Sequence, residues 1–280
     1  RRRFVSWLSD QFHGNRPYDK VVRSLITAEG LWTSNPEGNF LTVTVNPNVV
    51  STTNLDGGIT SDTTTITVDS TAGFASKGKI KIDSETISYT GRTPTTFTGA
   101  TVAGSHSDGA QVNDNEKNKP DEVKLAVRMT RAFLGVRLDC VQCHNDRIND
   151  RWKQKDFHQL ASFFAGTDMA ISGIRETDKP YEFKYRRQGD PVKVPAIVPF
   201  QHELLPESGN PRHRLAHWVT HSENRAFARA TVNRVWALMF GRPLVDPVDE
   251  IPLQDSFENP YPPGLETLAD DLIIHKFDLR

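Results

Sequence analysis

The chain has 280 residues, of which 36% are hydrophobic and 25% are charged, and its formal net charge at pH 7 is -1. This composition is ordinary for a globular protein, and the balanced charge argues against a general nucleic-acid binder, which normally carries a basic excess. No apolar run in the sequence is long enough to form a transmembrane helix. Because the chain starts at Arg1 without an initiator Met or an apolar signal sequence, we expect it to be part of a longer protein.

Two helices are predicted in the first 30 residues. Apolar side chains recur at helical spacing from Phe4 to Phe12 and again from Val21 to Ile26. Pro17 suits the first turn of the second helix, because its missing N–H would be unpaired there in any case.

From about Leu41 to about Asn118 the chain is rich in Thr, Ser and Gly. Ile, Val and Tyr alternate with polar residues in the runs 65–68, 79–82 and 86–89, and clusters of turn-forming residues separate these runs. Side chains branched at Cβ pack well on a pleated surface, which favours strands over a disordered Thr-rich linker. The segment therefore predicts a small all-β module.

Helical patterns return at Pro120. They predict helices at about 121–138, 155–165, 211–221 and 224–241 and a last helix after Pro262-Pro263, whereas the Pro-rich residues 178–208 predict one or two strands and a long connection. The helix at 224–241 is apolar on two sides, so we expect it to be buried. Its Arg229 and Arg234 then need carboxylate partners, for which Asp246, Asp249 and Glu250 are near in sequence.

These patterns together predict a mainly α fold in which a small all-β insertion, a sandwich or a barrel, interrupts a helical domain. We expect residues 1–40 and 119–177 to form this discontinuous helical domain. Residues 41–118 would be the inserted β module, and residues 178–280 the start of a second helical domain.

The only two cysteines of the chain lie three positions apart in the pentapeptide Cys140-Val141-Gln142-Cys143-His144. Covalent haem attachment needs two cysteines on one turn, each of which forms a thioether with a vinyl group, and a histidine directly after them that coordinates the iron. The pentapeptide therefore predicts a haem c site, in which Cys140 and Cys143 attach the haem and His144 is the proximal iron ligand.

Zinc binding and redox chemistry are the alternatives for this pair of cysteines. A structural zinc site needs four protein ligands, and since a second pair of cysteines is missing, histidines would have to complete it. His158 lies within range, and His213, His217 and His221 share one helical face at a spacing that suits metal ligands. A thioredoxin-like site would follow a strand, whereas this pair follows a predicted helix.

The surroundings of the motif resemble a known family. The stretch RAFLGVRLDCVQCHNDRINDRWKQKDFHQLASFFAG, residues 131–166, is similar to the central motif of the planctomycete cytochrome c-like domain, the PSCyt family of unknown function. NRPYDKVVRSLITAEG, residues 15–30, resembles the stretch that precedes this motif, and residues 212–251 resemble the start of the companion PSD domain. The β module resembles, more weakly, small Thr- and Gly-rich modules of phage and surface proteins.

The resemblance implies an exported, haem-associated protein of unknown biochemical activity, with Cys140, Cys143 and His144 at the haem-binding positions. It also implies that the discontinuous helical domain is cytochrome c-like. Many members carry a second histidine shortly after the motif, where this chain has Asp146. We therefore expect the distal position of the iron to be open or weakly held, with Met169 and then His158 as the next candidates for that ligand.

Charged and aromatic residues near the motif have candidate roles beside a haem. Arg137, Arg147, Arg151 and Lys153 are candidates to pair with the haem propionates, although a solvated charged face is the ordinary alternative. Trp152 would give the macrocycle an apolar wall.

We expect a c-type haem protein of the periplasm or cell surface that transfers electrons to a partner protein, whose identity the sequence does not give. The alternative is a structural or adhesion protein of the cell surface that binds glycan or protein through the β module, without haem. No Ser-His-Asp order, phosphate loop or carboxylate pair predicts a catalytic site, so an enzymatic role would be that of a haem-dependent oxidoreductase.

Overall fold

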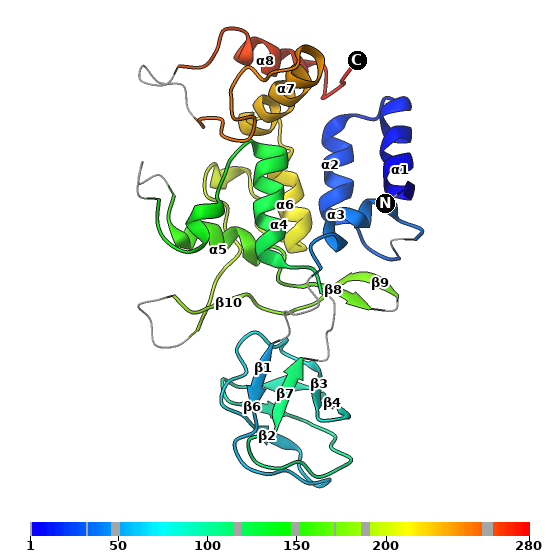
Figure 1. Cartoon of the computed structure of the whole chain (residues 1–280), viewed down its shortest axis with the longest axis vertical. Helices are drawn as coiled ribbons and strands as arrows, with labels where there is room; N and C mark the ends of the chain where they lie inside the picture. Colours follow the sequence, from blue (N-terminus) through cyan, green and yellow to red (C-terminus); the bar gives the residue numbers. More distant parts are fainter. Residues whose placement is uncertain are drawn as a thin grey trace. The chain divides into compact units, whose positions relative to one another are not determined.

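The computed structural model describes residues 2–31, 33–45, 51–114, 119–146, 152–170, 172–185, 191–253 and 260–280. It divides into two compact units. The helical unit comprises residues 1–44, 122–164 and 196–280, and the strand unit comprises residues 45–121 and 165–195. Figure 1 shows the helices of the first unit and the small sheets of the second.

The helical unit is built from short and medium helices close to the predicted positions. Its elements are α1 (Arg2–His13), α2 (Tyr18–Thr27), η1 (Pro36–Gly38), α3 (Asn39–Thr42), α4 (Glu122–Met129), the π-helical turn η2 (Thr130–Leu134), the 3-10 turn η3 (Asp139–Gln142), α5 (Gln154–Ser162), η4 (His202–Leu204), α6 (Pro211–Val219), α7 (Arg225–Phe240) and α8 (Leu265–Ile274). Across the described ranges, none of the helices has the length and apolarity that a membrane crossing requires.

Segments that are distant in sequence pack together in the helical unit. Helix α2 packs against α6, α4 against α5, and α7 against both α8 and η2. The fully buried guanidinium of Arg212 in α6 donates to the carbonyl oxygens of Ile26 (3.1 Å) and Ala28 (2.9 Å) at the end of α2. These bonds satisfy carbonyl groups that the end of a helix leaves without helical partners.

Gly135 ends the helical segment that leads to the cysteine motif. The helix expected at 121–138 is shorter, because α4 passes into η2 and Gly135 then adopts a left-handed backbone conformation with φ of 62°. A Cβ atom at this position would lie 2.8 Å from Cδ1 of Ile251, so a larger residue would displace its neighbour. The N–H of Ile251 donates to the carbonyl of Gly135 at 2.8 Å, which fixes the start of the segment that enters η3.

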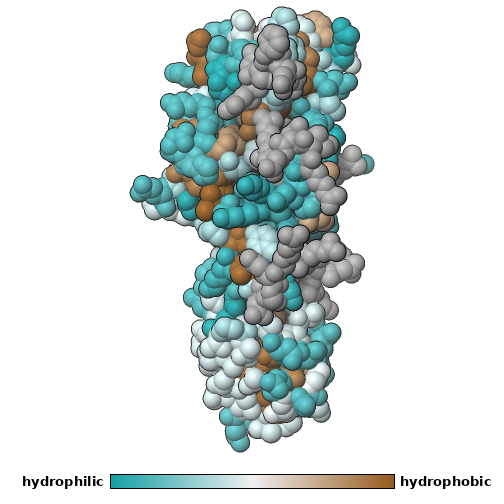
Figure 2. All heavy atoms as spheres, turned by 90° about the vertical axis from the view of Figure 1, so that its left-hand side faces the viewer, coloured by the Kyte–Doolittle hydropathy of each residue, from teal (hydrophilic) through white to brown (hydrophobic). Residues whose placement is uncertain are grey.

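The β module forms two antiparallel sheets in the strand unit. Its strands are β1 (Thr52–Asn54), β2 (Thr65–Thr67), β3 (Gly78–Ile82), β4 (Glu85–Tyr89), β5 (Gly91–Arg92), β6 (Thr96–Thr98) and β7 (Gln111–Asp114), in the orders β1-β7-β3-β4 and β2-β6-β5. The predicted alternation is confirmed, because Ile80, Ile82 and Ile87 point into one core together with Ile66 and Phe97. Figure 2 shows the surface of this module as largely near-white, as expected for Thr, Ser and Gly.

Two short hairpins complete the strand unit. They are β8 (Thr167–Ala170) with β9 (Gly173–Glu176), and β10 (Glu182–Phe183) with β11 (Val192–Lys193). Buried ion pairs join this segment to the β module: Arg92 Nη2 lies 2.7 Å from Glu182 Oε1, and Lys179 Nζ lies 2.7 Å from Asp114 Oδ2.

The expectation of a mainly α fold is wrong. About 37% of the structure is helix and 17% is strand, in several small sheets, so the protein is a mixed α/β protein. The sequence patterns missed the hairpin β8–β9, whose strands of four residues are too short to establish an alternation. The predicted domain boundaries stay predictions, since compactness in space does not show which segments fold independently.

Candidate functional site

The two cysteines lie on a single exposed turn. Element η3 (Asp139–Gln142) contains Cys140, and the N–H of Cys143 donates to the carbonyl of Cys140 at 3.4 Å. Val141 is buried and anchors the turn, whereas both cysteines are exposed and free. The fold therefore presents two thiols three positions apart on the surface of the helical unit.

His144 follows the turn with a defined tautomer. Its Nδ1 lies 2.7 Å from the carbonyl oxygen of Asn145. A carbonyl oxygen only accepts, so Nδ1 is the donor of this hydrogen bond, and in the neutral imidazole the lone pair is then on Nε2. The side chain is exposed. An imidazole in this state is ready to coordinate a metal through Nε2, since a hydrogen bond from the other ring nitrogen commonly orients histidine ligands.

The turn is held by the start of α5. The carbonyl oxygen of Gln142 accepts hydrogen bonds from Gln154 Nε2 (3.0 Å) and His158 Nε2 (3.1 Å). The backbone N–H of Gln154 donates to Asn145 Oδ1 at 2.9 Å. Two different residues of the motif loop are thus fixed to one helix, which limits the conformations that the cysteines sample.

His158 is a buried donor under the turn. It is 1% exposed, and burial lowers its pKa to about 4, so the imidazole is neutral at physiological pH. Since Nε2 donates to Gln142, coordination of iron by Nε2 would require this hydrogen bond to break. His158 as a distal ligand stays a prediction, with this added cost.

Met169, the other candidate for the distal position, lies in β8 of the strand unit and is partly buried. Its backbone N–H donates to its neighbour Asp168 Oδ1 at 2.7 Å. The structure brings Cys140, Cys143, His144 and His158 together in one unit, and Met169 belongs to the other unit. Its role as a ligand stays a prediction.

Two of the histidines expected on one helical face are in contact, although only His213 and His217 lie in α6 and His221 follows its end. The ring centroids of His217 and His221 are 5.3 Å apart, and burial, Arg23 and His221 lower the pKa of His217. His221 Nδ1 already accepts a hydrogen bond from the N–H of Glu223. Within the described ranges, no three His, Cys, Asp or Glu side chains form a group that could hold a metal ion, which gives the zinc alternative no support.

Asp249 joins the segment before the cysteines to the C-terminal part of the chain. Its Oδ2 accepts from Arg131 Nε at 2.6 Å, and its Oδ1 accepts from Arg137 Nη2 at 2.8 Å. Burial raises the pKa of Asp249, but the hydrogen bonds from the two arginines outweigh it, so the pKa lies below the ordinary value. Arg137 is therefore engaged by Asp249, while Arg147 and Arg151 lie outside the described residues.

The carboxylate partners expected for the two arginines of α7 were wrong. Arg229 hydrogen-bonds Glu266 in α8 and lies over the ring of Tyr261, with Cζ 4.6 Å from the ring centroid. Arg234 Nη2 donates to the carbonyl oxygen of Arg131 at 2.5 Å. Sequence proximity misled the prediction, because the true partners come from other helices.

Trp152 is almost fully buried, and its ring centroid lies 6.3 Å from that of Phe200. A backbone hydrogen bond joins it to the end of the segment that follows the cysteines, since the N–H of Asp146 donates to the carbonyl of Trp152 at 2.8 Å. The indole thus belongs to the core that supports the loop, and its role as a wall for a macrocycle stays a prediction.

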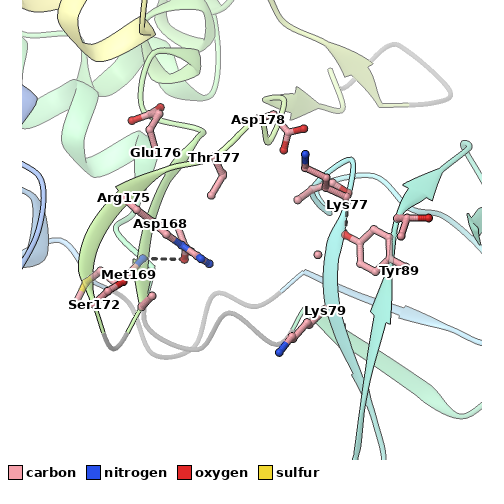
Figure 3. Close-up of a pocket in the computed structure, with 14 residues that line it drawn as sticks. Lys77, Lys79, Tyr89, Asp168, Met169, Ser172, Arg175, Glu176, Thr177 and Asp178 are labelled. Atoms are coloured by element: carbon pink, nitrogen blue, oxygen red, sulfur yellow. Dashed lines mark hydrogen bonds and ion pairs between the residues drawn. The ribbon is translucent and has the colours of Figure 1, made fainter. Parts of the chain in front are cut away.

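Away from the cysteine motif, a cleft lies in the strand unit, where β3 and β4 face the β8–β9 hairpin (Figure 3). It has a volume of about 1490 Å³ and is lined mainly by polar and charged side chains, among them Lys77, Lys79, Arg175 and Asp178. Tyr89, the one aromatic residue among its described lining residues, is 4% exposed and donates its hydroxyl to the carbonyl of Ala75 at 2.8 Å. The described lining of this cleft therefore offers no exposed aromatic ring for stacking against a sugar.

The comparisons with known proteins identify two families. The family model described as PSCyt2, protein of unknown function (DUF1549), matches residues 1–169, and the one described as PSD1, protein of unknown function (DUF1553), matches residues 211–280. No curated protein and no solved structure matches the chain. The matches confirm the two domains that the sequence resembles, and the structure shows that Asp249 of the second segment holds Arg131 and Arg137 of the first.

Proposed function

We propose, from the premise that the chain belongs to the PSCyt2 family of proteins of unknown function (DUF1549), that Cys140 and Cys143 attach a haem covalently and that His144 is its proximal iron ligand. The observation that carries the proposal is the turn itself, which presents two free, exposed thiols and then an exposed imidazole with a proton on Nδ1. Covalent attachment of haem c requires these groups in this order.

The residues present fit a haem. Cys140 lies in the 3-10 turn and Cys143 directly follows it, and the hydrogen bonds from Gln154 and His158 to the carbonyl of Gln142 hold that turn. The hydrogen bond from His144 Nδ1 to Asn145 leaves Nε2 as the donor atom for iron.

The attachment chemistry balances without an oxidant. Each thiol adds across one vinyl double bond, so that a C–S bond forms at one carbon and the thiol proton is placed on the other carbon. Both cysteines must therefore be reduced for the attachment. A disulfide between them would consume both thiols and block the reaction.

We propose electron transfer at the cell surface or in the periplasm as the function of this site. A bound haem supplies reversible one-electron chemistry at its iron. The exposure of Cys140, Cys143 and His144 favours contact with a partner protein over the binding of a small substrate in an enclosed cavity. Export is an implication of the family resemblance, and the partner is an unidentified redox protein.

The adhesion alternative has no comparable observation behind it. Most of the residues that line the cleft in Figure 3 are polar or charged, and among its described lining residues the only aromatic side chain is buried. We therefore propose the haem function alone.

The test is expression in a host with c-type cytochrome maturation machinery. After denaturing electrophoresis the protein should stain for haem, and its pyridine haemochrome spectrum should be that of haem c. The double variant Cys140→Ser/Cys143→Ser should lose the haem stain. His144→Ala should lose either the stain or the histidine ligand of the iron. His213→Ala, which removes another exposed histidine, should keep both the stain and the ligand. A wild-type chain that stays unstained beside a c-type cytochrome matured in the same cells would overturn the proposal.

A further inference from the structure

A cleft of about 560 Å³ lies directly beside the cysteine turn, entirely within the helical unit. Gln142, which lies between the two cysteines, is part of its wall, together with Asp139 before them. The other walls come from α4, η2, α7 and the segment at Asp249. Each cysteine directly adjoins a residue of this wall in the sequence, so a group attached to Cys140 and Cys143 would lie near the cleft.

The cleft has an excess of positive charge. Four cationic side chains line it (Lys124, Arg128, Arg131 and Arg234), whereas only two carboxylates do (Asp139 and Asp249). Both carboxylates are engaged by Arg131, at 2.6 Å for Asp249 and 3.5 Å for Asp139. The charge of Arg131 is thus already balanced, and the excess includes the charges of Arg128 and Arg234.

Arg128 and Arg234 are the cations that no carboxylate balances within the described part of the chain. Arg128 is exposed and lies over the ring of Phe40, with Cζ 5.5 Å from the ring centroid. Arg234 makes one hydrogen bond from Nη2 to a backbone carbonyl, and its buried Nε has no acceptor among the described atoms. A buried N–H donor without a partner is unfavourable, so this site favours an anionic acceptor.

The same cleft has an apolar side. Val123, Val127 and Ala132 line it along α4 and η2. It therefore combines an apolar wall with an excess of two positive charges, which matches a flat apolar molecule that carries two carboxylates. Two arginine guanidinium groups are also the donors that bind carboxylates with the best geometry.

We propose that this cleft binds the two propionate carboxylates of the haem attached at Cys140 and Cys143, with Arg128 and Arg234 as their donors. The inference rests on the proposed function, since it needs the haem, and it assigns the carboxylate end of that haem to two residues that the sequence did not connect with the propionates. The candidates from sequence were Arg137, Arg147, Arg151 and Lys153. Arg137 is bound to Asp249, Arg147 and Arg151 lie outside the described residues, and Lys153 does not line the cleft.

The test uses the haem-loaded chain and its midpoint potential as a function of pH. Arg128→Gln removes a positive charge, so the ferric state gains stability and the potential should fall. The pH at which the potential responds to propionate ionisation should rise by about one to three units, the range for a carboxylate that loses an adjacent cation. Arg234→Lys keeps the charge but removes the planar donor, and should give a smaller shift in the same direction.

The matched control is Lys155→Gln, which removes an exposed cation of α5 that does not line the cleft. It should leave the potential and its pH response unchanged. If the wild-type chain stains for haem but Arg128→Gln, Arg234→Lys and Lys155→Gln all match it in potential and pH response, the cleft assignment is overturned and the haem proposal stands. If the wild-type chain acquires no covalent haem, both are overturned.

Discussion

His158 Nε2 donates to the backbone carbonyl oxygen of Gln142 across 3.1 Å, so the middle of the cysteine turn is supported by a buried histidine from α5. Burial lowers the pKa of this imidazole to about 4, so the ring that donates from Nε2 is neutral at physiological pH. His158 is therefore a positioning residue, because it holds the backbone of the turn that carries the two cysteines.

The first prediction concerns this contact. His158→Ala should lower the free energy of unfolding by about 1–3 kcal/mol, because it removes a buried hydrogen bond and leaves a cavity. It should also reduce the yield of covalent haem. His158→Gln, whose side-chain amide is a donor, should recover part of both. Denaturant unfolding and haem staining measure the two effects.

The spectrum separates positioning from ligation. In the haem-loaded His158→Gln protein, the ferric spin state should equal that of wild type. A change of spin state with an unaltered yield of attachment would instead identify His158 as the distal ligand.

The second prediction concerns Asp249. Asp249→Asn should destabilise the chain by roughly 2 kcal/mol, because the carboxylate accepts charged hydrogen bonds from both Arg131 and Arg137. The control is Glu250→Gln, since Glu250 is exposed and lies 3.7 Å from Arg137. Equal unfolding midpoints for the two variants would show that the contact between the two family segments does not depend on Asp249.

The same carboxylate predicts acid sensitivity. The pKa of Asp249 in the folded protein is lower than its ordinary value of 3.8. Its contribution to stability is therefore complete above that ordinary value and is lost as the pH falls through the lower, folded value. Unfolding curves of wild type and Asp249→Asn should approach each other below about pH 4; a constant gap down to pH 2 would argue against this linkage.

The third prediction concerns a buried histidine in the β module. His106 lies between two carboxylates, with Nδ1 2.8 Å from Asp83 Oδ2 and Nε2 2.9 Å from Glu85 Oε2. The hydrogen bond to Asp83 raises the pKa of His106 above 6.5. Burial acts in the opposite direction, and the hydrogen bond to Glu85 and its charge add to the increase. Its contribution to stability is thus complete below the unfolded pKa and is lost as the pH rises through the raised folded value.

Thermal unfolding between pH 5 and 9 measures this effect. The unfolding temperature of the β module should fall in wild type as the pH rises. In His106→Gln the unfolding temperature should depend less on pH. His202→Gln, at an exposed position in η4, is the control that should behave as wild type. A wild-type midpoint that does not change over this range would show that protonated His106, held between Asp83 and Glu85, does not stabilise the module.

The fourth prediction is that the helical unit folds without the β module. The N–H of Asp114 donates to the carbonyl of Ser51 at 2.8 Å, so the ends of the module lie side by side. Replacing residues 52–113 with a short Gly/Ser linker should therefore leave a soluble chain with its helical circular dichroism intact. Complete loss of the helical signal would show that the helices depend on the module.

The sequence allowed local structure to be predicted better than long-range contacts. Val21, Val22, Leu25 and Ile26 are buried as their helical spacing indicated, and the alternation around Ile80 gave the correct strands. Such patterns reflect neighbours within one element. Asp249 was paired with the wrong arginines because its true partner Arg131 lies 118 residues away. Periodicity carries no information about contacts at that separation.

At the candidate site, too, the local motif could be predicted from the sequence and the long-range contacts could not. The order Cys140, Cys143, His144 was evident from spacing, and the structure adds the tautomer of His144 and the support from His158. Neither follows from sequence, since both depend on where a backbone carbonyl lies. The excess charge beside the turn was also missed, because Arg128 and Arg234 come from helices of different family segments.

The central claim is tested most directly by the intact mass of the mature chain from a host with cytochrome c maturation machinery. The account predicts a mass larger than the polypeptide by one haem, and an unmodified mass for Cys140→Ser/Cys143→Ser. A wild-type mass equal to the polypeptide alone, or lower by the two hydrogens of a disulfide between Cys140 and Cys143, would contradict it.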